Sequence, residues 1–501
     1  MGLPSTLLSA NALSLLTNTE FEAFSDSVVW ASMVQVFILI GALLIGNLIR
    51  RAIPFMRKSL IPSALLGGTI VLLLKLIPAV NEFIDNGFMD IITYHCLGIG
   101  FIAQALKKSN LKRKGAIKGI VETGVLTGGV YSIQAMLGLA ISIILTVAGG
   151  FSFAAGGVLL CLGYGQGTGQ ALNFGTSFEN DYGFEGGRTF GLSIAAIGFL
   201  VAAVVGVIYL NILRKKGKLR VVSKAEGEEH KLRDFIGENE IPTTESVDKM
   251  TINIGIVLAI YAVVYGIMCL FQLANVGLVW GFNFLFGSLL ALLTRLILNF
   301  LSKKKVLKQE PTNNYLLDRI SGFAFDMMII AGVAAIDLTE FSKLWWQLLI
   351  ICTVGAVATF VYIRFVANNI YKGYEHEGFI SMFGMMTGTA SSGMILLREI
   401  DPKLETPASS NLVYSGLPAI AFAGGLLLLL NYCPKGLTQS LITLAILFVA
   451  SVAFTLVLFR NKIFRRKKKL VVVEGGESAP KDAPAEETAA SDADNEPPQE
   501  N

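Results

Sequence analysis

The sequence has few charged residues, few histidines and few cysteines. Only 16% of its 501 residues are Asp, Glu, Lys or Arg, whereas soluble domains contain about 25%. Hydrophobic residues make up 53% of the chain, and its mean hydropathy is +0.61. Together these values exclude an ordinary soluble globular protein and indicate an integral membrane protein.

The scarcity of histidine and cysteine limits the chemistry that the chain can perform. The sequence shows no Cys/His spacing typical of a metal site or a disulfide framework, and no nucleophile paired with a base. It therefore predicts neither a metal cofactor nor an enzyme. The Lys and Arg residues are concentrated in loops, which does not favour nucleic-acid binding. The five cysteines are scattered, mostly within apolar stretches, at Cys96, Cys161, Cys269, Cys352 and Cys433.

About eleven apolar stretches approach the length of roughly 20 residues that a membrane-spanning helix needs. A transmembrane barrel would instead show short alternating strands. Residues 1–27 lack the basic start of a signal peptide and are expected to remain as an extracytoplasmic N-terminus. The expected spans cover residues 28–49, 60–79, 87–106, 119–148, 187–212, 251–272, 276–301, 320–339, 346–370, 409–431 and 437–459.

Basic residues follow the first, third, fifth, seventh and eleventh spans, as at residues 303–305 and 465–469. Basic loops stay in the cytoplasm, so we expect every odd-numbered span to end there. This arrangement holds only if two glycine-rich stretches, residues 151–175 and 377–398, enter and leave the membrane on the same side. Both are therefore predicted to be re-entrant hairpins, the first entering from outside and the second from inside.

The spans divide into two units of opposite orientation, residues 28–212 and 250–431, each with one hairpin between its last two spans. A charged cytoplasmic linker at 213–249 joins them. A further transmembrane helix at 432–463 precedes a basic and then acidic tail, residues 464–501, which is expected to be disordered in the cytoplasm. The predicted fold is an all-α polytopic membrane protein built on an inverted repeat.

Each hairpin combines glycine with hydroxyl or amide side chains. The N–H groups at the start of a half-helix suit a carboxylate, and the C=O groups at the end of the other half suit Na⁺. Small residues that merely allow tight helix packing are the alternative interpretation. The residues predicted to bind substrate are Gln166, Gly167, Thr168, Gly169, Gln170, Thr387, Gly388, Thr389, Ser391 and Ser392.

Oxygen-bearing side chains are the candidate ligands for a coupling cation, because hard cations prefer oxygen. We select Thr168 and Thr389 in the hairpins and Asp326 in the eighth span, since an ionisable group within a span is costly to maintain. Glu122 in the fourth span is a second acidic candidate. An interhelical hydrogen-bonding role remains the alternative for both acidic residues.

Three basic or titratable residues have two interpretations each. His95 in the third span would suit proton coupling, although a lone histidine is more often part of the core. Arg188 and Arg398 follow and end the two hairpins, where an arginine could bind a substrate carboxylate or anchor the helix end. Anchoring is the preferred interpretation for both arginines.

These motifs resemble the sodium/glutamate symporter family. Beyond the hairpins, the resemblance rests on Ile-Pro-Ser-Ala-Leu-Leu-Gly-Gly at residues 61–68 and on Leu-Gly-Ile-Gly at 97–100 before a basic loop. It extends from about Val28 to Phe459. Two departures lie in the hairpins: Gln166 stands where the family typically has a histidine, and residues 388–391 lack its proline.

The resemblance implies a homodimeric carrier in the plasma membrane, with Na⁺ as coupling ion and glutamate as substrate. It also implies an elevator-type transport domain that holds both hairpins. The expected function is therefore secondary active symport of Na⁺ with glutamate or a related anionic amino acid. The alternatives are a proton- or sodium-coupled carrier of another carboxylate or amino acid, and a passive channel.

Overall fold

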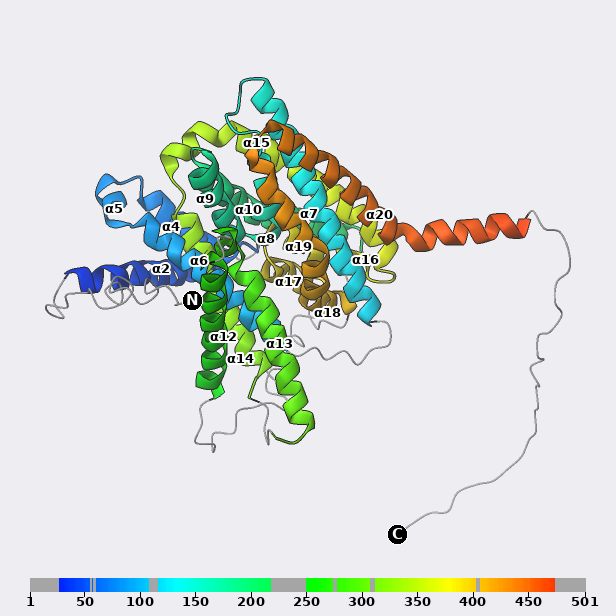
Figure 1. The fold of residues 1–501 in the computed structure, drawn as a ribbon, viewed down its shortest axis with the longest axis horizontal. Coiled ribbons are helices and arrows are strands. Elements are labelled where there is room, and N and C mark those ends of the chain that lie inside the picture. The colour runs from blue at the N-terminus through cyan, green and yellow to red at the C-terminus, as the bar shows by residue number, and fades with distance from the viewer. Residues whose placement is uncertain are drawn as a thin grey trace, which may run out of the picture. The chain divides into compact units, whose positions relative to one another are not determined.

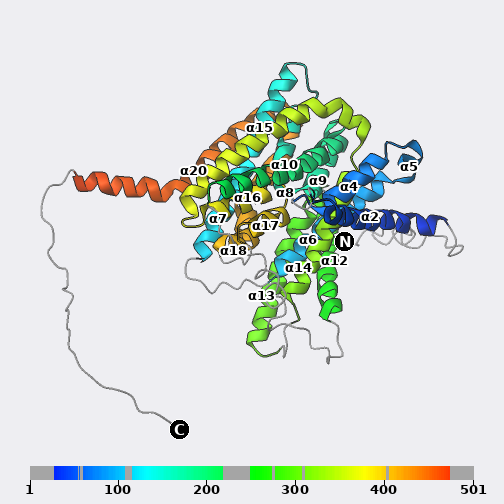
Figure 2. The same cartoon turned by 180° about the vertical axis from the view of Figure 1, so that it is seen from behind.

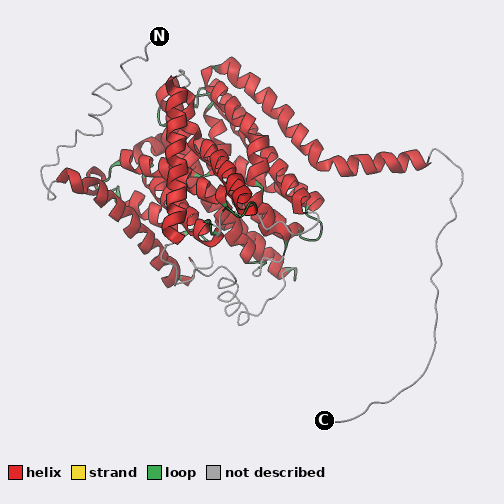
Figure 3. Cartoon of the chain, turned by 60° about the horizontal axis from the view of Figure 1, so that its bottom comes forward, coloured by secondary structure: helices red, strands yellow, loops and turns green. Residues whose placement is uncertain are grey.

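A computed structural model describes residues 27–54, 56, 60–107, 116–217, 249–273, 277–306, 311–401 and 406–473. All regular structure in these residues is helical, with no strand (Figure 3). The predicted all-helical membrane protein is confirmed at this level. The N-terminal segment 1–26, residues 218–248 of the expected linker and the tail beyond 473 lie outside the described residues.

Within the described residues, eight helices are long and apolar enough to cross a membrane. Apolar runs of this length form helices in a bilayer because the helix satisfies its own backbone hydrogen bonds. The eight spans lie in α2 (Ser27–Ala52), α6 (Asn86–Leu106), α7 (Ala116–Val147), α10 (Gly187–Lys215), α12 (Lys249–Leu273), α13 (Asn283–Lys303), α15 (Leu338–Ile370) and α20 (Leu437–Val473).

The other three expected spans are shorter or more polar than the sequence pattern suggested. The second becomes α4 (Ser63–Leu74), which is only 12 residues long and is followed by α5 (Pro78–Phe83). The tenth is divided into α18 (Pro407–Tyr414) and α19 (Gly416–Tyr432). The eighth, α14 (Asn314–Ala334), has 21 residues but includes charged side chains, which lower its hydropathy.

The first bundle consists of α2, α4, α6, α12, α13 and α14, which pack against one another. Glycines allow the closest of these contacts. A Cβ on Gly68 of α4 would lie 2.8 Å from Cβ of Val333 in α14, and one on Gly100 of α6 would lie 2.5 Å from the Phe325 ring. In both ribbon views α12, α13 and α14 are grouped away from α7, α15 and α16 (Figures 1 and 2).

The second bundle consists of α7, α10, α15, α18, α19 and two helix pairs that are broken in the middle. The first pair is α8 (Leu159–Gln166) and α9 (Thr168–Tyr182), and the second is α16 (Glu375–Thr387) and α17 (Ala390–Arg398). α10 contacts all four of these short helices. Each half of the chain therefore contributes three helices to the first bundle and a broken pair with its neighbours to the second.

Within the second bundle, the two broken pairs begin at opposite ends of α10. The Phe153 ring, which precedes α8, lies 4.7 Å from the Phe184 ring just before α10, measured between centroids. At the other end of α10, Tyr209 Oη lies 2.7 Å from Nδ1 of His376, at the start of α16. Just beyond α17, Glu399 accepts a bond from Arg214 at 3.4 Å.

The last helix, α20, crosses a boundary between two compact units. Residues up to Leu458 belong to one unit, and residues from Phe459 onward belong to the other. The helix itself runs to Val473, which is longer than the span at 437–459 that the sequence suggested. The broken helix pairs and both bundles therefore belong to the larger unit.

Candidate functional site

The first helix pair is interrupted at Gly167. α8 ends at Gln166, α9 begins at Thr168, and Gly167 between them has a φ of 76°. L-residues with a Cβ rarely adopt this conformation, so glycine is favoured at the break. The first N–H groups of α9 have no acceptor within their own helix. They point toward the break, where the positive end of the helix dipole favours an anion.

The second helix pair is interrupted at Gly388. α16 ends at Thr387, and Thr389 caps α17 by accepting a hydrogen bond from the Ser392 backbone N–H at 3.4 Å. The Thr387 hydroxyl instead donates to the Phe383 carbonyl oxygen of its own helix at 2.7 Å. Ser392 is buried, whereas Ser391 is exposed. The predicted hydroxyl residues of this helix pair therefore differ in their hydrogen-bond partners and in their burial.

The tips of the two pairs are in contact. A Cβ built on Gly167 would lie 3.4 Å from Cγ2 of Thr389 and 3.8 Å from the Gly388 carbonyl oxygen. The Thr168 hydroxyl, one residue further, donates to the Met328 carbonyl oxygen of α14 at 3.1 Å. The fold thus brings together residues from both halves of the chain, and places them beside the first bundle.

Gln170, on the first turn of α9, is fully buried. Neither its amide nitrogen nor its amide oxygen has a hydrogen-bond partner in the described structure. The Ser392 hydroxyl is also buried without a partner. An unsatisfied buried polar group costs about 1–3 kcal/mol, so such a group at a helix break is expected to meet a ligand.

A buried glutamine holds the second tip in place. Gln134 in α7 donates from Nε2 to the Met386 carbonyl oxygen at 2.9 Å and to the Thr359 hydroxyl of α15 at 2.9 Å. The Tyr131 hydroxyl donates to the Gly165 carbonyl oxygen beside the first tip at 3.1 Å. Gln134 and Tyr131 were not among the site residues predicted from the sequence. Their signal was a polar group in the middle of an apolar span.

A cavity of about 180 Å³ lies between the two bundles at the tips. Gln166, Gly388 and Thr389 line it from the second bundle. From the first bundle, its lining continues along α6 and α13 to Lys107 and Arg295. Lys107 ends α6 at the side that the basic loops assign to the cytoplasm. The cavity therefore connects the tips with the predicted cytoplasmic ends of the helices.

A second hollow is lined by residues of α6 and α9. That hollow has a volume of about 660 Å³ and is lined by Asp90, Tyr94 and Asn173 among others. Between it and the inner cavity, Gly169 of α9 packs on α6, and a Cβ there would lie 2.6 Å from Leu97. Along α6 and α9, this contact therefore lies between the residues that line the two hollows.

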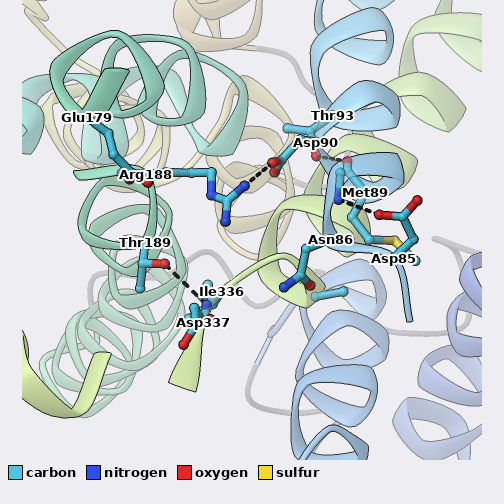
Figure 4. Close-up of polar contacts among 12 residues, drawn as sticks. Asp85, Asn86, Met89, Asp90, Thr93, Glu179, Arg188, Thr189, Ile336 and Asp337 are labelled. Carbon is cyan, nitrogen blue, oxygen red and sulfur yellow. Dashed lines mark hydrogen bonds and ion pairs between the residues drawn. The ribbon is translucent and has the colours of Figure 1, made fainter. Parts of the chain in front are cut away.

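A smaller hollow of about 360 Å³ lies beside the start of α10 and is lined by Glu179, Arg188, Thr189 and Asp337 among others. Polar contacts close this end of the interface between the bundles. Nη1 of Arg188 donates to Oδ2 of Asp90 in α6 at 2.6 Å, and the two side chains point toward each other (Figure 4). The Asp337 backbone N–H donates to the Thr189 hydroxyl at 3.2 Å. This end, which the basic loops predict to face outward, is therefore linked across the bundles.

Asp337 lies in the loop between α14 and α15, outside the helical spans. Its carboxylate caps α15 by accepting bonds from the backbone N–H groups of Thr339 at 2.7 Å and Glu340 at 3.2 Å. Partial burial acts against ionisation, but these hydrogen bonds outweigh it and hold the pKa of Asp337 below its usual value. The loop at the outer end of the interface therefore carries a stable negative charge.

The two acidic span residues selected from the sequence lie away from the tips. Asp326 of α14 is absent from the residues that line the inner cavity, although its neighbours Phe325 and Met328 do line it. Glu122 faces Lys118 of its own helix, with 3.8 Å between the charged atoms.

The remaining candidates have contacts of a structural kind. His95 lies 2.8 Å from the Tyr261 hydroxyl of α12, measured from Nδ1, and lines the hollow of about 660 Å³. Arg188 forms the ion pair with Asp90, which agrees with the anchoring interpretation. Arg398 is exposed at the end of α17.

Two broken helices whose tips meet beside a cavity, within a polytopic helical membrane protein, define a membrane transporter of the carrier class. The sequence matches the family model described as Sodium/glutamate symporter over residues 30–387. This match covers more than half of the chain, and the chain belongs to the sodium/glutamate symporter family. A comparison with curated proteins finds no match.

Family membership confirms the function expected from the sequence. The chain is a multi-pass plasma-membrane protein that couples Na⁺ to the transport of glutamate or a related anionic amino acid. It belongs to a transporter family and not to an enzyme family.

Proposed function

We propose that the two helix pairs are re-entrant hairpins of an inverted repeat and that their tips together bind glutamate and Na⁺. The observation that carries this proposal is the contact between Gly167 and Thr389, beside the unpartnered amide of Gln170. The start of α9 offers N–H groups to a carboxylate, and the end of α16 offers C=O groups to Na⁺. Both ligands would then meet at one place.

The proposed substrate site contains the residues selected from the sequence in the two tips, residues 166–170 and 387–392. Thr168 and Thr389 are the proposed side-chain ligands of Na⁺, because both lie where the tips meet. Asp326 is left out of the proposed sodium site, because it belongs to α14 and not to either tip.

We further propose elevator-type transport, in which the second bundle carries the tips past the first bundle. Two features support this division: both broken pairs belong to the second bundle, and each half supplies equivalent helices to each bundle. The Na⁺ gradient and the membrane potential would supply the work. The electrical part is about 2.3 kcal/mol per charge for each 100 mV.

The test is uptake of labelled glutamate into proteoliposomes, with and without an inward Na⁺ gradient. Thr389→Val should lower the apparent Na⁺ affinity several-fold, and Gln170→Ala should raise the KM for glutamate. Thr146→Val is the matched control, because its hydroxyl bonds only to the Ser142 carbonyl oxygen of its own helix at 2.8 Å. Unchanged Na⁺ and glutamate dependence in both tip variants would refute the proposed site.

The homodimer implied by the family resemblance is also a proposal. Light scattering of the purified protein in detergent measures its mass directly. A monomeric mass across the working concentration range would rule the dimer out under those conditions.

A further inference from the structure

We propose that Arg295 forms an anion-binding subsite at the cytoplasmic end of the inner cavity, and that it takes a substrate carboxylate as glutamate leaves the hairpin tips. This inference rests on the proposed function, in which the tips hold the substrate. It adds a residue from the first bundle that acts on one side of the membrane only. Arg295 thereby contributes to the preference for anionic over neutral amino acids.

The position of Arg295 is defined by a backbone contact. The residue lies in α13, and its Nη1 donates to the Lys107 carbonyl oxygen at the end of α6, at 2.7 Å. This bond holds the side chain at the cavity wall, which Arg295 lines together with Gln104 and Ser288. An arginine has five N–H donors, so donors remain for a carboxylate.

The described lining of the cavity carries positive charge and no negative charge. Its charged residues are Lys107 and Arg295, and none of the described lining residues is Asp or Glu. Lys107 is already paired with Asp318, at 2.5 Å. Within the described part of the chain, no carboxylate pairs with Arg295. A cavity with one sign of charge concentrates ligands of the opposite sign.

The chemistry of the guanidinium group matches the substrate class. Arginine binds a carboxylate through two parallel N–H···O bonds, which a neutral amide side chain cannot reproduce. An anionic amino acid carries a side-chain carboxylate, which Arg295 can bind once the substrate has moved from the tips into the cavity. The same continuous cavity is lined by Thr389 at the tips and by Arg295 at the other end.

The effect of Arg295 should depend on the side from which substrate binds. The tips belong to the second bundle, whereas Arg295 belongs to the first. When the second bundle moves the tips toward the outer face, Arg295 stays behind. Its interaction therefore contributes to binding from the cytoplasm and not to binding from outside.

The experiment compares right-side-out with inside-out membrane vesicles that contain the full-length protein. Arg295→Gln should raise the KM for glutamate about tenfold from the cytoplasmic face, equivalent to about 1.4 kcal/mol. The KM from the outer face should change less than about twofold. Inhibition by glutamine, measured at the same face, should change little, because its side chain has no charge.

Two further variants test whether the KM change is specific to the guanidinium group of Arg295. Arg295→Lys keeps the charge but not the paired donors, so its KM from the cytoplasmic face should lie between those of wild type and Arg295→Gln. Arg319→Gln is the matched control, because the Arg319 guanidinium lies over the exposed Tyr315 ring, 5.0 Å from its centroid. It should leave the KM unchanged at both faces.

Equal KM changes at the two faces, or no change from the cytoplasm, would overturn the subsite. Gln170→Ala separates this failure from failure of the proposed function, since loss of a tip contact should raise the KM at both faces. A one-sided effect of Arg295→Gln with no effect of Gln170→Ala would retain the cytoplasmic subsite and reject the tip site. Thermal unfolding of each purified variant checks that the protein remains folded.

Discussion

The two ends of the interface between the bundles use charge differently. At the outer end, Asp90 of the first bundle and Arg188 of the second pair across the interface at 2.6 Å. At the inner end, Lys107 and Asp318 pair within the first bundle. Arg295 there donates to a backbone oxygen and pairs with no carboxylate in the described part of the chain. At the outer end an ion pair therefore connects the two bundles. At the inner end the charged residues belong to the first bundle, and Lys107 and Arg295 line the cavity.

The two ends are therefore expected to have different roles in transport. A charge-assisted hydrogen bond across the outer end holds the bundles together there. The absence of such a link among the described inner residues leaves room for a solute between the tips and the helix ends. Between the two ends, the first tip packs tightly on the first bundle, where Gly169 meets Leu97 and Thr168 meets Gly332. Changing the contact with Gly332, the outer link or the inner pair tests the comparison separately.

The largest expected effect comes from filling the tight contact between the bundles. A Cβ on Gly332 of α14 would lie 2.6 Å from Cβ of Thr168. Gly332→Val should therefore push the first tip away from α14, reduce uptake by at least about tenfold and destabilise the protein by about 1–3 kcal/mol. Uptake and thermal unfolding measure the two effects.

Gly322→Ala is the matched control on the same helix. A Cβ there would meet nothing within 4 Å. Alanine in a helix interior is favoured over glycine by about 0.5–1 kcal/mol, so this variant should be as stable as wild type and fully active. Normal uptake by Gly332→Val would show that the contact with Thr168 is unimportant for transport.

The second effect concerns the outer ion pair. Asp90→Asn removes a charge-assisted interaction worth about 1.5–3 kcal/mol. The population should then shift about tenfold toward states in which the outer end is open. A cysteine introduced by Gln104→Cys in the inner cavity should consequently be labelled more slowly by an impermeant thiol reagent from the cytoplasmic face.

Two controls accompany this measurement. Protein without the Gln104→Cys change reports labelling of the native cysteines. The double variant Asp90→Arg/Arg188→Asp reverses the pair and should restore part of the labelling rate. Identical labelling rates in the wild-type and Asp90→Asn backgrounds would mean that the ion pair does not affect the balance between states open to the inside and states open to the outside.

The smallest effect is expected at the inner ion pair. The Asp318 side chain is 59% exposed, and exposed pairs contribute about 0–1 kcal/mol. Asp318→Asn should therefore change the cytoplasmic KM less than about threefold, and less still at high salt. A change as large as that expected for Arg295→Gln would instead assign the recognition of the anion to Lys107.

Part of this organisation could be predicted from the sequence. The glycine-rich breaks at residues 163–170 and 384–393 were visible because they interrupt apolar stretches. They correspond to the ends of α8 and α16. The length of α4 was overestimated, because apolar residues continue past Leu74 although the helix ends there. Hydropathy measures the polarity of a segment and does not indicate the residue at which a helix ends.

The outer pair and the cavity could not be predicted in the same way. Asp90 and Arg188 are 98 residues apart, and nothing local in the sequence indicates that they meet. Arg295 appeared as one basic residue near the end of an apolar span. Its role depends on the absence of acidic residues among the described residues of a lining that several helices form together.

Apolar length and backbone flexibility are local properties, so the helical membrane protein and its two glycine-rich breaks could be predicted from the sequence. The sequence also contains the motifs that identify the family. The meeting of the breaks at Gly167 and Thr389, the buried Gln170 with no partner among the described residues, and the place of Arg295 in the cavity lining became visible only in the folded structure. These facts arise from packing between distant segments, which a single apolar pattern does not encode.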